Sequence, residues 1–152
     1  MEGLSEYRQR LLDRMAGVVG ELRSALMAVL DPRAPLEAGG WNPHQVISHL
    51  RDVNEQVYLP RLHRIVDEDN PQFENFDADA WMSAHYDLKE PMEKMLTEFT
   101  RQCIDTAEWL RHLPLEVWSR PGTHPSYGTR TLQWWAERAL GHIEEHLATM
   151  KK

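Results

Sequence analysis

The chain has 152 residues, of which 41% are hydrophobic, and its 24 acidic side chains outnumber its 17 basic ones, for a net charge of -7. This length and composition suit one globular domain, which we expect to span residues 1–152. The acidic balance argues against nucleic acid as a partner, because neutralising phosphates takes clustered lysine and arginine side chains.

The single cysteine, Cys103, excludes an internal disulfide and favours a reducing compartment, so we expect a cytoplasmic protein. No segment has the pattern of a signal peptide or the long apolar run of a membrane span. We therefore expect no membrane partner.

Apolar residues spaced by three and four positions predict four long amphipathic helices. Their expected ranges are residues 4–30, 43–67, 92–110 and 132–150. Asn42 is suited to cap the second helix, and residues 68–77 predict a longer connection followed by a short helix over 77–86. Residues 120–128 are rich in turn formers, and no segment shows a strand pattern. Four such helices favour an all-α four-helix bundle, because each apolar face must be covered by another.

Three histidines carry the main functional signal. His142 and His146 are four residues apart in the last helix and therefore share one side of it, next to the buried stripe. His49 borders the buried stripe of the second helix in the same way. Buried neutral imidazoles lose hydration, and a shared divalent ion can satisfy one nitrogen of each. The sequence therefore predicts a three-histidine metal site with room for water or a substrate.

Two carboxylates are candidate catalytic residues beside this site. Asp52 lies one turn after His49, and Glu145 directly precedes His146. We expect them to orient an imidazole or to transfer protons near bound water. Residues 142–146 also match the His-x-x-Glu-His order of one zinc-protease class, but that class needs a further ligand downstream and too short a segment follows His146.

The remaining reactive or aromatic side chains have simpler interpretations. Cys103 falls on an apolar stripe, which favours a buried, inert thiol, and His124 lies in a turn-rich loop, where we expect a structural hydrogen bond. Trp134 and Trp135 are adjacent and cannot both face the core, so Trp134 marks either a dimer contact or a partly buried position. Solvated or dipole-paired positions are expected for His44, His63, His85 and His112.

Several short segments, taken in order and spacing, resemble the DinB-like superfamily, in particular its YfiT-like branch of metal-binding four-helix bundles. The segments are WNP at 41–43, ISHLRD at 47–52, FDADAW at 76–81, WSRPGTHP at 118–125, GTRTL at 128–132 and HIEEHL at 142–147. The resemblance implies an up-down-down-up bundle with a long crossover between the second and third helices. It also implies a homodimer and a divalent metal, usually zinc or nickel, held by His49, His142 and His146.

This family includes S-transferases that use bacillithiol and maleylpyruvate isomerases that use mycothiol. The resemblance therefore implies a metal-dependent transferase that activates a low-molecular-weight thiol for attack on an electrophilic substrate. Two alternatives stay open. One is a hydrolase that uses hydroxide bound to the metal, with Glu145 or Asp52 as its base. The other is a stress-associated protein that binds metal, or a partner, without catalysis.

Overall fold

The computed structural model describes residues 2–37 and 39–151, and it confirms the predicted four-helix bundle. The long helices are α1 (Glu2–Met27), α2 (Pro43–Val53) continued through the π-helical η1 (Asn54–Tyr58) into α3 (Leu59–Asp67), α5 (Met92–Arg111) and α6 (Leu132–Met150). The smaller elements are α4 (Ala78–His85), the short helix η2 (Leu115–Ser119), and the strands β1 (Pro121–His124) and β2 (Gly128–Thr131).

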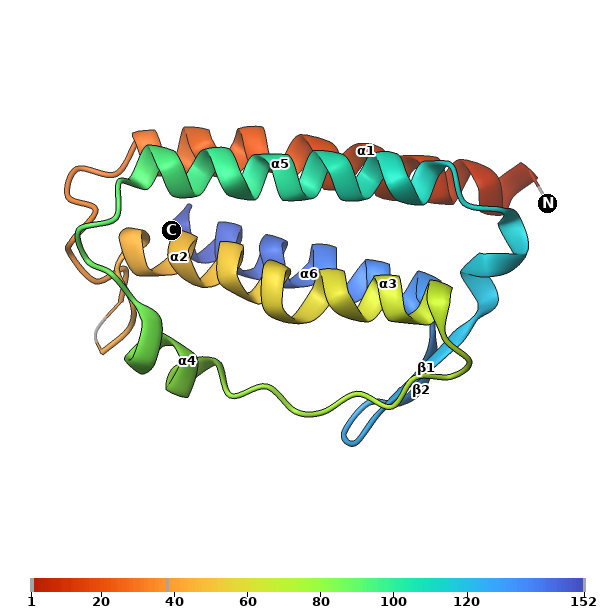
Figure 1. Ribbon diagram of the computed structural model, residues 1–152. Coiled ribbons are helices and arrows are strands. Elements are labelled where there is room, and N and C mark those ends of the chain that lie inside the picture. Colours follow the sequence, from red (N-terminus) through yellow and green to blue (C-terminus); the bar gives the residue numbers. More distant parts are fainter. Residues whose placement is uncertain (1, 38, 152) are drawn as a thin grey trace.

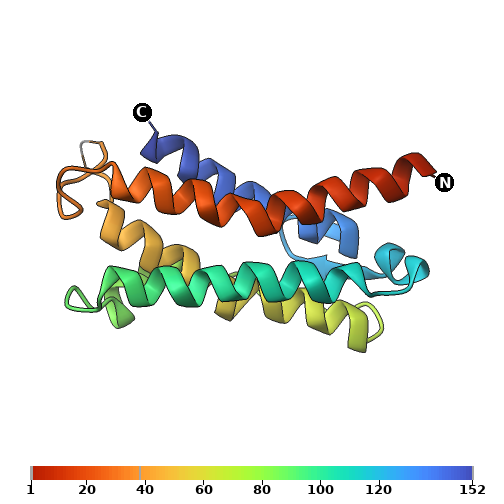
Figure 2. The ribbon, with the colours of Figure 1, turned by 90° about the horizontal axis from the view of Figure 1, so that it is seen from above.

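The helices follow the expected up-down-down-up order (Figure 1). Helices α1 and α5 form one layer, and the continuous α2–α3 helix lies with α6 in the other. Seen from above, α1 and α5 run side by side (Figure 2). Because α2–α3 and α5 run in the same direction, the chain must return along the whole bundle between them. Residues 68–91 make this crossover, and α4 lies within it.

Local capping defines where the two histidine-bearing helices begin. The Asn42 side chain accepts the backbone N–H of Gln45 at 2.8 Å, and the Gln45 side chain accepts the N–H of Asn42 at 2.9 Å. This reciprocal arrangement satisfies amides that the first turn of α2 leaves without partners. Thr131 caps α6 by accepting the N–H of Trp134 at 3.2 Å. The cap predicted at Asn42 is therefore confirmed.

The first helix ends earlier than predicted, at Met27 instead of Leu30. Leu30 is fully exposed, so packing gives this turn no reason to stay helical. The Asp31 carboxylate accepts the N–H of Arg33 at 2.9 Å and stabilises a turn in its place. Within residues 2–37 and 39–151, no helix combines the length and apolar composition needed to cross a membrane.

The segment predicted to contain turns alone forms a β-hairpin, so the expectation of no strands is wrong. Pro121 pairs with Thr131 and His124 with Gly128 in an antiparallel register. The strands have four residues each, too few for a period-two pattern to be recognised in the sequence. The crossover adds to this hairpin, because the N–H of Phe73 donates to the Thr123 carbonyl at 2.8 Å.

Gly122 allows the hairpin to pack closely on the crossover. A Cβ at this position would lie 2.6 Å from the Phe73 ring and 2.9 Å from Ile65. We expect Gly122→Ala to lower the free energy of unfolding by about 1–3 kcal/mol, since buried neighbours would have to move. Urea denaturation followed by circular dichroism measures this change. Gly20→Ala is the control, because a Cβ there meets nothing within 4 Å. At this exposed position of α1, alanine should stabilise the helix by about 0.5–1 kcal/mol.

A buried charge network joins α2 to the crossover and to α5. The Arg51 guanidinium donates from Nη2 to Glu90 at 2.9 Å and from Nε to Asp52 at 2.9 Å. The second Asp52 oxygen accepts the indole N–H of Trp81, on α4, at 3.0 Å. Lys94, in the first turn of α5, donates to Glu90 at 2.6 Å. Asp52 therefore has a clear structural role.

This network should make the fold sensitive to acid. The hydrogen bond from Arg51 lowers the pKa of Glu90 from 4.5 to about 2. A carboxyl group with a lowered pKa in the folded state stabilises the protein above its ordinary pKa, and this contribution is lost as the pH falls from about 4.5 towards 2. We expect the stability difference between wild type and Glu90→Gln to shrink by about 1 kcal/mol between neutral pH and about pH 3. Urea titrations at both pH values test this; an unchanged difference would contradict it.

Candidate metal centre

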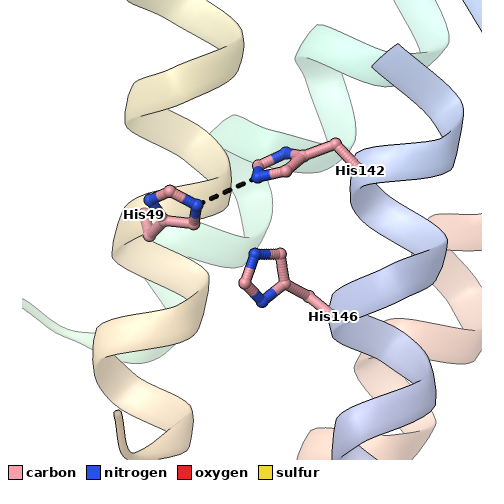
Figure 3. Close-up of side chains that lie close together, drawn as sticks. All are labelled: His49, His142 and His146. Carbon is pink, nitrogen blue, oxygen red and sulfur yellow. Dashed lines mark hydrogen bonds between the residues drawn. The ribbon is translucent and has the colours of Figure 1, made fainter. Parts of the chain in front are cut away.

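The structure brings the three predicted histidines together (Figure 3). Helix α2 contributes His49, and α6 contributes His142 and His146. One potential ligand nitrogen from each lies within 4.8 Å of the other two. The Nε2 atoms of His49 and His142 are 3.0 Å apart, although 93 residues separate them in the chain. Two helices from distant parts of the sequence therefore build one cluster.

Packing holds the imidazole rings in this arrangement. Only 5% of His49 and 9% of His142 is exposed. The Trp41 ring packs on His49 with centroids 4.6 Å apart, and the Tyr58 ring lies 5.4 Å from His142. His142 and His146 lie one helical turn apart, with ring centroids separated by 4.8 Å. Trp41 and Tyr58 thus cover part of the cluster and restrict rotation of the imidazole rings.

The surroundings keep all three imidazoles neutral at physiological pH. Burial, followed by repulsion from His146, lowers the pKa of His49 to about 4. Burial and the two neighbouring histidines lower the pKa of His142 to about 3. Burial also lowers the pKa of His146. Neutral imidazole has a free lone pair, which is the form that binds metal ions.

The donor set fits a divalent cation. The facing Nε2 atoms of His49 and His142 can share only one hydrogen bond, and Nδ1 of His142 is buried without a protein partner in the described part of the chain. A cation would use the lone pairs that converge on the centre of the cluster. Zinc and nickel both accept imidazole nitrogen. Three protein ligands leave a further coordination position for a small molecule.

Neither predicted catalytic carboxylate is brought to the imidazoles. Asp52 is held by Arg51 and Trp81, as described above. Glu145 is exposed, and its carboxylate accepts a hydrogen bond from Arg138 at 3.1 Å. Among the described residues, neither is a hydrogen-bond partner of the three histidines. Proton transfer by either carboxylate stays a prediction that no contact in the structure supports.

Two further sequence predictions are confirmed at buried positions. Cys103 is 2% exposed, and burial raises the pKa of its thiol to about 12, so it stays protonated and inert. His124 has a structural hydrogen-bonding role, because its Nδ1 accepts the backbone N–H of Ser126 at 3.0 Å and of Tyr127 at 3.3 Å.

The solvated position predicted for His44 is wrong. It is 2% exposed, and its ring bonds the Tyr86 hydroxyl at Nδ1 and the Glu90 carbonyl at Nε2, the latter at 2.7 Å. The crossover covers this first turn of α2, which the local sequence cannot show. Exposed positions are confirmed for His63, His85 and His112.

Trp134 is partly buried on the hairpin side of α6. Its ring lies 5.4 Å from Tyr127, and the Arg130 guanidinium lies 5.0 Å above it. These contacts within one copy of the chain explain the partial burial of the Trp134 ring. The homodimer stays a prediction, which light scattering can test.

A pocket of about 340 Å³ opens beside the histidine cluster. Its walls come from the α2–α3 helix, the crossover, the hairpin and α6. The lining residues are His49, Val53, Val57, Tyr58, Arg61, Asn75, Phe76, Ala78, His124, Ser126, Tyr127, Arg138 and His142. No carboxylate is among them. Sequence reasoning missed the two arginines and the two tyrosines of this lining.

The π-helical turn η1 helps to align one wall of the pocket. His49, Val53, Val57 and Arg61 follow one another in steps of four, whereas an α-helical turn holds 3.6 residues. In a regular helix this row would drift around the axis. A π turn holds more residues, because its hydrogen bonds run from i to i+5, and it reduces the drift. This four-residue spacing from His49 is the feature of the sequence that could have identified Arg61 as a lining residue.

Comparison with known proteins places this chain in a family. The family model described as the DinB superfamily matches residues 6–150. The chain belongs to the DinB superfamily. This confirms the resemblance found in the sequence.

Two similar proteins can be compared directly with this chain. A protein of Oceanobacillus iheyensis, named as a candidate metal-dependent hydrolase, is 29% identical over 113 residues, which are 70% of this chain. The chain matches 64% of that relative, less than two thirds of its length. The solved structure of YfiT from Bacillus subtilis, described as a candidate metal-dependent hydrolase with an unusual four-helix bundle topology, superposes with a TM-score of 0.84. That comparison covers 96% of this chain and 85% of YfiT at 23% identity, a level that establishes the fold alone.

Proposed function

We propose that this DinB protein is a metal-dependent transferase that activates a low-molecular-weight thiol. His49, His142 and His146 would hold the ion, with zinc or nickel as the proposed metals. The observation that carries this proposal is that His49 and His142 line the wall of a pocket without carboxylates. A nucleophile and a second small molecule can therefore meet beside the cluster.

The protein's own side chains suit this chemistry. Three neutral imidazoles add no negative charge, so they would leave the full charge of a divalent cation to act on its next ligand. A bound cation of this kind lowers the pKa of a thiol, so that the thiol reacts as a thiolate at neutral pH. Trp41 and Tyr58 cover part of the His49 and His142 rings, and Val53 with Phe76 offers apolar contacts to an electrophile.

A metal-dependent hydrolase is the second candidate, and the names given to both relatives favour it. Water would then replace the thiol as the nucleophile. A hydrolase of this type commonly uses a carboxylate to accept the proton, and the pocket lining offers none. This difference is why we place the transferase first.

Activity assays on protein purified without a histidine tag distinguish the two. Zinc-loaded and nickel-loaded protein would be incubated with 1-chloro-2,4-dinitrobenzene and monochlorobimane, each with cysteine or thioglycerol, and thioether products measured by mass spectrometry. Conjugation that requires the metal supports the transferase. Metal-dependent cleavage of p-nitrophenyl acetate without thiol supports the hydrolase. Metal binding with neither reaction would contradict both.

A further inference from the structure

Arg61 is a partly buried cation that lacks a carboxylate partner among the described residues. Its guanidinium lies over the Phe73 ring at 5.5 Å and the Trp135 ring at 5.2 Å, and it donates to the Glu74 carbonyl at 2.8 Å. Nearby arginines differ in this respect, because Arg64 pairs with Glu68 and Arg138 with Glu145. Part of the hydrogen-bonding capacity of Arg61 is therefore free.

The position of Arg61 makes this free cation energetically unfavourable. Burial lowers the pKa of its guanidinium, which shows that the charge has lost part of its hydration. An anionic ligand would supply the missing charge, and a carboxylate can accept two parallel hydrogen bonds from a guanidinium.

A second donor lines the pocket with Arg61. Nδ1 of His124 accepts two backbone N–H groups, so the proton of the neutral ring lies on Nε2. No described residue accepts a hydrogen bond from this Nε2–H group. Tyr58 and Tyr127, each with a hydroxyl group, belong to the same lining. The lining of this pocket therefore offers several donors and no carboxylate.

The histidine cluster lines another part of the same pocket. His49 and His142 line it from α2 and α6, whereas Arg61 lines it from α3 and His124 from the hairpin. A molecule in the pocket can thus present one end to the cluster and the other to Arg61. The volume of about 340 Å³ admits a small organic molecule.

We propose that Arg61, assisted by His124, binds a carboxylate group of the small molecule that occupies this pocket. The inference rests on the proposed function, whose substrates it narrows to carboxylate-bearing compounds. The carboxylate can belong to the thiol or to the electrophile, and both cases use the same contact.

Calorimetric titration of the zinc-loaded protein with succinate and with succinamide tests this contact. The two probes have nearly the same shape, but only succinate is charged. We expect succinate to bind about tenfold more tightly, and Arg61→Gln to remove this preference, since a hydrogen bond to a charged group accounts for at least about tenfold in affinity. Arg61→Lys should keep part of it. Equal binding of the two probes by the wild type would overturn the inference.

Arg64→Gln is the matched control. Arg64 also stacks on Phe73, at 5.3 Å, but it pairs with Glu68 and does not line this pocket. The Arg64→Gln variant should bind succinate as tightly as the wild type does. Succinate binding that persists in Arg61→Gln would mean that the carboxylate binds elsewhere, for example at the ion, and would also overturn the inference. Thermal melts of each variant verify folding.

Absorption spectra of the cobalt-substituted protein with added thiol test the proposed function independently of the role of Arg61. If mercaptosuccinate binds more tightly than thioglycerol, and Arg61→Gln removes this difference, the carboxylate belongs to the thiol. If the two thiols bind equally well and succinate still binds through Arg61, the carboxylate belongs to the electrophile. If neither thiol changes the spectrum, the transferase proposal fails, while the succinate titrations still decide the role of Arg61.

Discussion

Alanine in place of His142 is expected to remove stoichiometric divalent metal from the protein and to weaken zinc binding by more than about 100-fold. The change deletes one of three imidazoles whose nitrogens lie within 4.8 Å of one another. The two that remain cannot define a three-ligand site. Elemental analysis of protein purified without a histidine tag measures the metal content. Titration with zinc against a chromophoric chelator measures the affinity.

Two further variants show whether the effect belongs to the cluster. His49→Ala should lose metal in the same way, although His49 lies on a different helix. His63→Ala should keep it, because His63 is exposed and stacks on Trp109 with ring centroids 3.8 Å apart. Metal retained by both cluster variants, or a wild-type protein that cannot be loaded, would contradict the proposed metal centre.

Replacing Arg51 with methionine is expected to lower the free energy of unfolding by about 3–5 kcal/mol. The Arg51 side chain is 11% exposed and pairs with Asp52 and Glu90, whose side chains are 12% and 14% exposed. Removing it leaves two buried carboxylates without their main partner. Urea denaturation at neutral pH, followed by circular dichroism, measures the loss.

Arg23 provides a matched control for the role of burial. It also makes two hydrogen bonds to a glutamate of α5, Glu93, at 2.8 and 2.9 Å, but its side chain is 39% exposed. Arg23→Met should therefore change stability by about 0–1 kcal/mol. Equal effects of the two substitutions would show that burial of the Arg51 network does not determine its contribution.

The sequence was most informative where a residue's role depends on its phase in a helix. His142 and His146 lie beside an apolar stripe that orients α6, so their convergence could be predicted before any contact was known. The same reasoning placed His49 and Cys103 on buried faces. The cap at Asn42 was predictable because it involves residues only three positions apart.

Features that depend on contacts between distant segments could not be predicted in this way. His44 is buried because the crossover covers it, and its partners Tyr86 and Glu90 are more than one helix away. Asp52 has the right spacing to assist His49, but Arg51 and Trp81 hold its carboxylate elsewhere. The spacing of hydrophobic residues along the sequence gives no information about such competing partners.

The pocket has two kinds of wall, and they differ in how freely they can change. The helical wall is part of the bundle core, so substitutions there would disturb the fold together with the histidine cluster. The opposite wall comes from the crossover and the hairpin, which are tied to each other by backbone hydrogen bonds between Phe73 and Thr123 and between Thr123 and Pro71. Exchanges confined to the pocket-lining residues 75–76, 78 and 126–127 of these two segments would reshape the entrance and leave the imidazoles in place. The protein is therefore a suitable starting scaffold for redirecting substrate choice by loop grafting.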